Sequence, residues 1–197
     1  MPSTFGAFWR EVWEHKSPAI IMVARERESG RLQCDDYWSL TRIGPFKMRI
    51  MSERAISQAE LDSREDRAGS ISPHQAPVVL LRTIELLHSQ HPDEPAHIVR
   101  QYQFLAWPDH SVPDKPDSLL GLMRLVHADT ASNRDAPTIV PCSAGIGRTG
   151  THILVDAVST FLHRVRHLVD KEATSPQVKY WDSPKDLIFE ALMVTRE

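Results

Sequence analysis

The first residues of the chain carry large apolar side chains at helical spacing. These side chains fall at positions i, i+3, i+4, i+7 and i+8, which are Phe5, Phe8, Trp9, Val12 and Trp13. This spacing places them on one face of a helix, which Thr4 could cap. The apolar run from Ala19 to Ala24 is too short for a helix of its own and is typical of a buried strand. The pattern predicts a helix followed by a core strand.

Three later stretches mix polar and apolar residues in a way that favours antiparallel strands, over residues 46–53, 78–87 and 97–105. Residues 55–76, between the first two, are polar and charged and end in residues that favour turns. We expect this segment to form a long excursion on the surface.

The second half of the chain changes to a pattern that favours helices. Asp117 or Ser118 could cap a helix whose apolar positions share a face, namely Leu119, Leu122, Met123 and Val126. The apolar residues within 137–142 predict a short buried strand. A long pattern of apolar residues at helical spacing begins at Gly147, and Ser183 is a start signal for a last helix. The order of elements predicts an α/β fold, with a central mixed sheet flanked by helices and a loop that joins a strand to a helix N-terminus.

Composition narrows the classes of function. With 197 residues and 41% hydrophobic content, residues 1–197 are expected to form a single domain. The net charge of −3, with both signs interleaved, indicates neither a nucleic-acid partner nor a membrane surface. There is no apolar run of transmembrane length and no signal-peptide pattern, and the two cysteines cannot form a disulfide framework. We expect a cytoplasmic location, with the nucleus also compatible.

The stretch "PCSAGIGRTG" carries the candidate chemistry. A turn between a strand and a helix N-terminus gathers backbone N–H groups, and Gly145 and Gly147 let the main chain approach an anion closely. Arg148, six residues after Cys142, can bind two oxygens of a phosphoryl group at once. The same environment is expected to lower the pKa of Cys142, to roughly 3.5–7.5. The Thr149 hydroxyl could bond the sulfur, so the loop predicts a thiolate nucleophile aimed at phosphate.

The string "CSAGIGRTG" resembles the signature loop of the protein tyrosine phosphatases. The resemblance implies that Cys142 attacks phosphorus, that Arg148 clamps the phosphoryl oxygens and that phosphotyrosine-containing proteins are the substrates. The substrate-binding residues that it implies are Ser143, Ala144, Gly145, Ile146, Gly147 and Arg148.

The resemblance also requires a general acid, because a tyrosyl leaving group needs a proton. "FLAWPDHSVP" resembles the acid loop of the family, in which Trp107 and Pro108 support Asp109, and Asp109 lies 33 residues before the cysteine. Glu28 falls where the family has a glutamate that pairs with the clamp arginine. The implied mechanism, with Cys142, Arg148, Asp109 and Thr149 as catalytic residues, passes through a phosphocysteine and requires no metal or cofactor.

Several positions depart from the family pattern. Pro141 replaces the usual histidine, and because proline has neither an N–H nor an imidazole, we expect a higher Cys142 pKa than in members with histidine. Tyr37 matches a tyrosine that bonds this histidine, so it would lose its partner. Ser111 replaces a frequent glycine of the acid loop. Cys34 is interpreted as a packing cysteine rather than a second nucleophile.

The resemblance covers nearly all of the chain, but the family's upstream tyrosine loop and downstream glutamine loop have no counterpart here. The sequence therefore resembles a catalytic domain truncated at both ends, and its oligomeric state is not indicated. One alternative is an inactive pseudophosphatase or phosphotyrosine-binding fragment. Another is a different enzyme with a cysteine–arginine anion loop, such as an arsenate reductase or a sulfurtransferase, but "WPD" argues against it.

Overall fold

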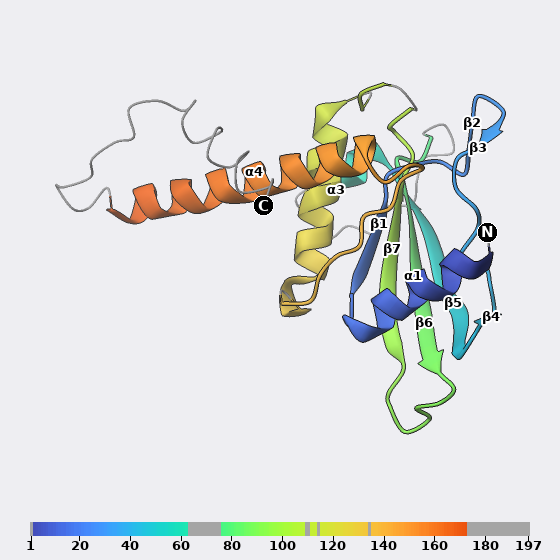
Figure 1. The fold of residues 1–197 in the computed structure, drawn as a ribbon. Coiled ribbons are helices and arrows are strands. Elements are labelled where there is room, and N and C mark those ends of the chain that lie inside the picture. The colour runs from blue at the N-terminus through green and yellow to red at the C-terminus, as the bar shows by residue number, and fades with distance from the viewer. Residues whose placement is uncertain (1, 63–75, 109–110, 114, 134, 173–197) are drawn as a thin grey trace. The chain divides into compact units, whose positions relative to one another are not determined.

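The computed structural model describes residues 2–62, 76–108, 111–113, 115–133 and 135–172. The chain divides into two compact units, residues 1–145 and residues 146–197. The first unit holds the sheet and all of the described elements except the last helix (Figure 1).

A mixed five-stranded sheet forms the centre of the first unit. Its strands lie in the order β1 (Ala19–Met22), β7 (His97–Phe104), β6 (Val79–His88), β5 (Phe46–Ile56) and β4 (Arg42–Ile43). The pair β1 and β7 is parallel and the other pairs are antiparallel. A separate two-stranded hairpin contains β2 (Arg27–Glu28) and β3 (Arg31–Leu32). The predicted α/β class, with its mixed sheet and flanking helices, is confirmed.

Helix α1 (Pro2–Glu14) lies along one face of this sheet (Figure 1). Trp9, Val12 and Trp13 are buried against sheet residues such as Ile20 and Ile84. The helix was correctly predicted, but its start was not, because it begins at Pro2 and Thr4 lies inside it. Proline suits the first helical position, where its fixed φ is already helical and its missing N–H would have no helical partner.

Helix α3 (Pro116–Asp129) packs on the opposite face. Its predicted apolar face is buried, at Leu119, Leu122, Met123 and Val126. Val99 of β7 packs in the same cluster as the apolar residues of α1, and Tyr102, three positions along the strand, faces the other side. The Tyr102 hydroxyl donates a hydrogen bond to Asp129 at the end of α3. A 3-10 turn, η1 (Ala131–Asn133), follows.

The predicted caps of α3 are wrong. The helix begins at Pro116 after Lys115, and no side chain caps it. The Ser118 hydroxyl instead donates a hydrogen bond to the Gln58 side chain in α2 (Gln58–Asp62). Proline at the first position again starts the helix earlier than the polar residues suggested.

The predicted surface segment, residues 55–76, begins later than expected. Strand β5 continues to Ile56 and α2 occupies residues 58–62, so both lie within the segment 55–76. Residues 63–75 of the predicted excursion lie outside the described residues.

Residues 137–142 do not form the predicted buried strand. They make a single parallel bridge between Ile139 and Ile20, and residues 138–142 are half-buried. The Ile21 N–H donates to the Ile139 carbonyl at 2.8 Å, and the Val23 N–H donates to the Pro141 carbonyl at 3.0 Å. Pro141 has no N–H to extend the ladder, so the pairing with β1 ends just before Cys142.

The second unit contains helix α4 (Gly147–Glu172), which confirms the long helical pattern predicted from Gly147. The predicted helix from Ser183 lies outside the described residues. Within the part of the chain that the structure describes, no helix has both the length and the hydropathy to cross a membrane.

Candidate active site

The segment that carries Cys142 is anchored to strand β1. The Val23 N–H holds the Pro141 carbonyl at 3.0 Å, and the half-buried Cys142 packs against the hydrophobic core of the first unit. After Cys142 the chain turns, and Gly145 adopts a φ of 71° that favours glycine. This turn directs the Gly145 N–H at the Cys142 sulfur, with a distance of 3.1 Å between N and Sγ. A backbone N–H donor at this distance stabilises negative charge on the sulfur.

The rest of the predicted binding loop begins the second unit. Helix α4 starts at Gly147, and the Gly150 N–H donates to the Ile146 carbonyl at 2.9 Å, which closes the first turn. Arg148 lies in this first turn and is 8% exposed, while Thr149 is half-buried. The helix N-terminus and the arginine belong to the same helical turn, and both favour an anion.

The remaining predicted loop residues, Ser143, Ala144, Gly145, Ile146 and Gly147, are exposed to solvent. Short or absent side chains at four of these five positions leave the backbone N–H groups accessible.

The predicted acid segment is held at its ends. Trp107 is 3% exposed, and its indole N–H donates to the Ser111 carbonyl at 2.9 Å. Pro108 is half-buried between them. Asp109 lies outside the described residues, so its role as general acid stays a prediction.

Glu28 is buried at the start of a tight hairpin. Its Oε1 accepts the backbone N–H of Arg25 at 3.0 Å, and positive φ angles at Ser29 and Gly30 turn the chain from β2 to β3. Arg148 belongs to the second unit, and the pairing of Glu28 with Arg148 stays a prediction.

Sequence reasoning missed Arg25. Its backbone N–H binds Glu28, and its side-chain Nε donates to the Leu105 carbonyl at 2.7 Å. The Arg25 and Leu105 residues are 80 positions apart, and no local pattern signals a contact across that distance.

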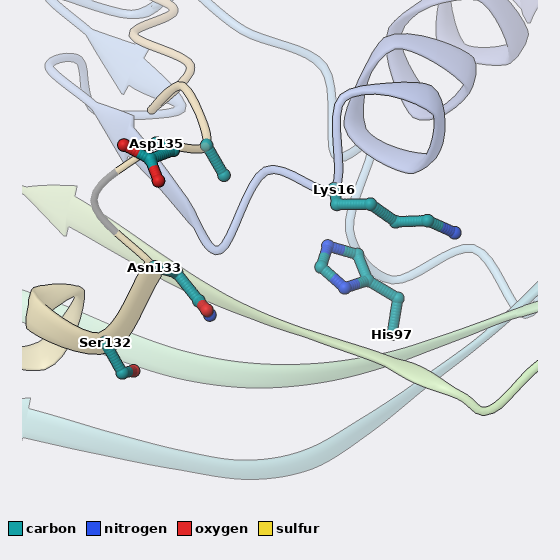
Figure 2. Close-up of a pocket in the computed structure, with 6 residues that line it drawn as sticks. Lys16, His97, Ser132, Asn133 and Asp135 are labelled. Atoms are coloured by element: carbon teal, nitrogen blue, oxygen red, sulfur yellow. The ribbon is translucent and has the colours of Figure 1, made fainter.

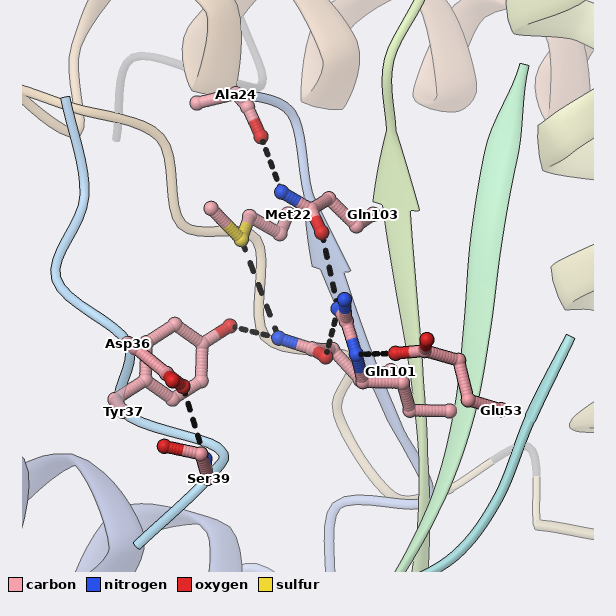
Figure 3. A network of polar contacts seen from close by, with 9 residues as sticks. Met22, Ala24, Asp36, Tyr37, Ser39, Glu53, Gln101 and Gln103 are labelled. Atoms are coloured by element: carbon pink, nitrogen blue, oxygen red, sulfur yellow. Dashed lines mark hydrogen bonds and ion pairs between the residues drawn. The ribbon is translucent and has the colours of Figure 1, made fainter. Parts of the chain in front are cut away.

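Tyr37, expected to lose the histidine that Pro141 replaces, has a different hydrogen-bond partner. The Gln101 side-chain amide donates to the Tyr37 hydroxyl oxygen at 2.9 Å (Figure 3). Arg82 donates to the side-chain amide oxygens of both Gln101 and Gln103. The side-chain amide N–H of Gln103 donates to the backbone carbonyl of Ala24 at 3.4 Å. Burial raises the pKa of Tyr37, so its hydroxyl stays protonated.

Cys34 has the properties of a packing cysteine. It is half-buried against the core, and neither it nor Cys142 is in a disulfide. Burial, reinforced by the carboxylates of Asp35 and Glu26, raises the pKa of Cys34 to about 11. A thiol with this pKa is protonated at neutral pH and is a poor nucleophile.

A hollow of about 400 Å³ lies where β1 and β7 begin, at the end of the sheet away from Cys142 (Figure 2). It is lined by Lys16, His97, Ser132, Asn133, Asp135 and Ala136. Among the described residues, none of those predicted for catalysis lines this hollow.

Comparison with known proteins decides the family. The sequence profile described as "Protein-tyrosine phosphatase" matches residues 1–179. The chain belongs to the protein-tyrosine phosphatase family. This assignment confirms the resemblance that the cysteine loop and the acid segment indicated.

Relatives of this phosphatase-family chain include receptor-type proteins. It is 38% identical over 177 residues to receptor-type tyrosine-protein phosphatase S of Gallus gallus, covering 85% of this chain and 10% of that protein. It is 35% identical over 167 residues to receptor-type tyrosine-protein phosphatase F of Danio rerio, covering 85% of this chain and 8% of that protein. It is 32% identical over 163 residues to receptor-type tyrosine-protein phosphatase H of Homo sapiens, covering 80% of this chain and 13% of that protein. The chain thus spans about a tenth of the length of these relatives.

Proposed function

We propose that this chain is a protein tyrosine phosphatase that hydrolyses phosphotyrosine on proteins through a phosphocysteine intermediate. The hydrogen bond from the Gly145 N–H to the Cys142 sulfur carries the proposal, because it gives the candidate nucleophile a donor that favours its thiolate form. Membership of the phosphatase family and the match of both sequence motifs support it.

In the first step, the Cys142 thiolate attacks phosphorus in line with the tyrosyl oxygen. The S–P bond forms as the P–O bond breaks, and Asp109 gives its proton to the departing oxygen. Arg148 and the backbone N–H groups of residues 143–148 bind the three equatorial oxygens and stabilise their charge. Tyrosine leaves, and Cys142 carries the phosphoryl group.

In the second step, water attacks the phosphocysteine. The ionised Asp109 takes a proton from this water, the P–S bond breaks, and inorganic phosphate is formed. The Thr149 hydroxyl bonds the departing thiolate. Glu28 acts by orienting Arg148, while Trp107 and Pro108 hold the segment that carries the acid. Neither step requires a metal or a cofactor.

Pro141 motivates a second candidate, a protein that binds phosphotyrosine without turnover. Its ring can neither donate to the loop nor replace the imidazole that the family usually has before the nucleophile, and Tyr37 is bonded to Gln101 instead. Weaker stabilisation of the thiolate would slow the first step while leaving the anion-binding loop intact.

The deciding experiment measures release of p-nitrophenol from p-nitrophenyl phosphate by the full chain, beside Cys142→Ser and Asp109→Ala. Turnover that Cys142→Ser abolishes and Asp109→Ala reduces supports the phosphatase. If the unmutated chain binds a fluorescent phosphotyrosine peptide but releases no p-nitrophenol, the binding protein is supported instead.

The proposed chemistry also bears on location. Cys142 must be a reduced thiol for turnover, which supports our proposal that the chain acts in a reducing compartment such as the cytoplasm. Phosphotyrosine-containing proteins are its proposed partners.

A further inference from the structure

We propose that Arg25 is a positioning residue that fixes the beginning of the acid segment relative to the strand that anchors the nucleophile. The proposal rests on the proposed function, since it assigns Asp109 as the acid. It adds a residue to which the sequence motifs give no role.

The side chain of Arg25 joins two parts of the site. Its Nε donates to the carbonyl of Leu105 at 2.7 Å, and Leu105 is the first residue after β7 and lies two positions before Trp107. The Leu105 N–H donates to the Val78 carbonyl at 2.8 Å. Leu105 is therefore held on both its N–H and its carbonyl side, and the chain that leads to Asp109 starts from a fixed point.

The other end of the connection is equally well held. Arg25 follows Val23 and Ala24, the two residues directly after β1, where the Val23 N–H binds the Pro141 carbonyl and the Ala24 carbonyl accepts from Gln103. The backbone N–H of Arg25 donates to Glu28 at 3.0 Å, which fixes the residue from which the guanidinium extends. The nucleophile segment and the acid segment are therefore both held by residues 23–25, directly after β1.

The chemistry of this contact is charge-assisted. A guanidinium N–H to a backbone carbonyl is a stronger hydrogen bond than a neutral pair, and its planar fork has a defined direction. General-acid catalysis depends steeply on geometry, because the acid must lie within hydrogen-bond reach of the leaving oxygen. A shift of the segment at Leu105 would reduce proton donation by Asp109 while leaving the Cys142 loop in place.

The test compares substrates that differ in their need for the acid. Phenyl phosphate has a poor leaving group and needs protonation, whereas p-nitrophenyl phosphate needs it much less. We expect Arg25→Ala to lower kcat for phenyl phosphate by about tenfold and for p-nitrophenyl phosphate by less than about threefold, with KM little changed. The matched control is Arg27→Ala, which removes a second exposed arginine two residues along the same segment and leaves both rates unchanged. Equal losses on both substrates would overturn the proposal.

A second measurement does not depend on activity. We expect Arg25→Ala to accelerate amide hydrogen exchange in the peptide 104–108 by about fivefold, while Arg27→Ala leaves it unchanged. Unchanged exchange in Arg25→Ala overturns the proposal even if the enzyme is active. If the unmutated chain lacks activity but exchange responds as expected, the assignment of function fails while the positional role of Arg25 stands.

Discussion

Replacing Arg82 by alanine tests how much of the stability of the sheet depends on buried polar contacts. Arg82 is 4% exposed and donates from Nη1 to Gln101 Oε1 at 3.0 Å and to Gln103 Oε1 at 2.9 Å. Its Nε also bonds Glu53, and its guanidinium carbon lies 4.7 Å from the centre of the Trp38 ring. One side chain therefore satisfies two buried amides (Figure 3). The same side chain covers the face of the Trp38 ring.

The cost of Arg82→Ala follows from what it leaves behind. Gln101 and Gln103 are 0% and 2% exposed, so their carbonyl oxygens would lose a donor that water cannot readily replace. Each unsatisfied buried acceptor costs about 1–3 kcal/mol, and loss of the contact with Trp38 adds about 0.5–2 kcal/mol. The Glu53 side chain is 49% exposed and regains water, so it adds little. We expect the free energy of unfolding to fall by about 4 kcal/mol and Tm by about 8–16 °C.

The assay is urea unfolding followed by circular dichroism and tryptophan fluorescence. Arg49→Ala is the matched control, since Arg49 lies on the same sheet but pairs with Glu85 at 3.0 Å on the exposed side. It should unfold at nearly the same urea concentration as the unmutated chain. If Arg82→Ala fails to fold, Arg82→Met retains the aliphatic stem and tests the lost donors alone. If Arg82→Ala and Arg82→Met each lose no more unfolding free energy than Arg49→Ala, the buried contacts of Arg82 do not stabilise the sheet.

Three further outcomes are expected. Because the pKa of Cys34 is about 11, iodoacetamide at pH 7 should alkylate Cys142 well before Cys34, and peptide mass spectrometry that finds equal rates would contradict this. Gly121→Ala should destabilise the chain by about 1–3 kcal/mol, because the added Cβ would lie 2.9 Å from a side-chain carbon of α2, whereas Gly6→Ala in α1 has open space and should raise Tm. Burial lowers the pKa of His97 below 6.5, so the unfolded state binds more protons just below that pH. Stability should therefore fall as the pH drops below 6.5, and less steeply in His97→Gln.

Local periodicity predicted the elements whose burial has a simple pattern. The apolar face of α1, the continuous apolar run of β1 and the helical pattern of α4 each specify their structure without distant contacts. Helix starts were less predictable, because Pro2 and Pro116 begin their helices ahead of the polar residues that could have capped them. Local sequence offers both kinds of start signal and does not determine which is used.

Polar residues on strands were harder to interpret. Arg82, Gln101 and Gln103 alternate with apolar residues in β6 and β7, and such positions are usually expected to face solvent. They are buried because the segment with Tyr37 and Trp38 covers that part of the sheet, and it comes from far away in the sequence. Tertiary contacts of this kind leave no periodic signal, which is also why the partner of Tyr37 was not anticipated.

The string from Cys142 to Gly150 predicts the chemistry, but the positions of the nucleophile and acid segments depend on residues 23–25, directly after β1. Three successive residues there bind three different parts of the chain: Val23 holds Pro141, Ala24 accepts from Gln103, and Arg25 holds Leu105. A displacement of this short segment would move the approach to the nucleophile and the approach to the acid together. Val23 and Ala24 bind through main-chain groups and are fully buried, so a larger side chain at either position would displace these contacts, whereas a substitution of Arg25 removes its contact directly. Such substitutions are expected to change catalysis without touching the substrate, and their effects should be non-additive because the three residues are adjacent.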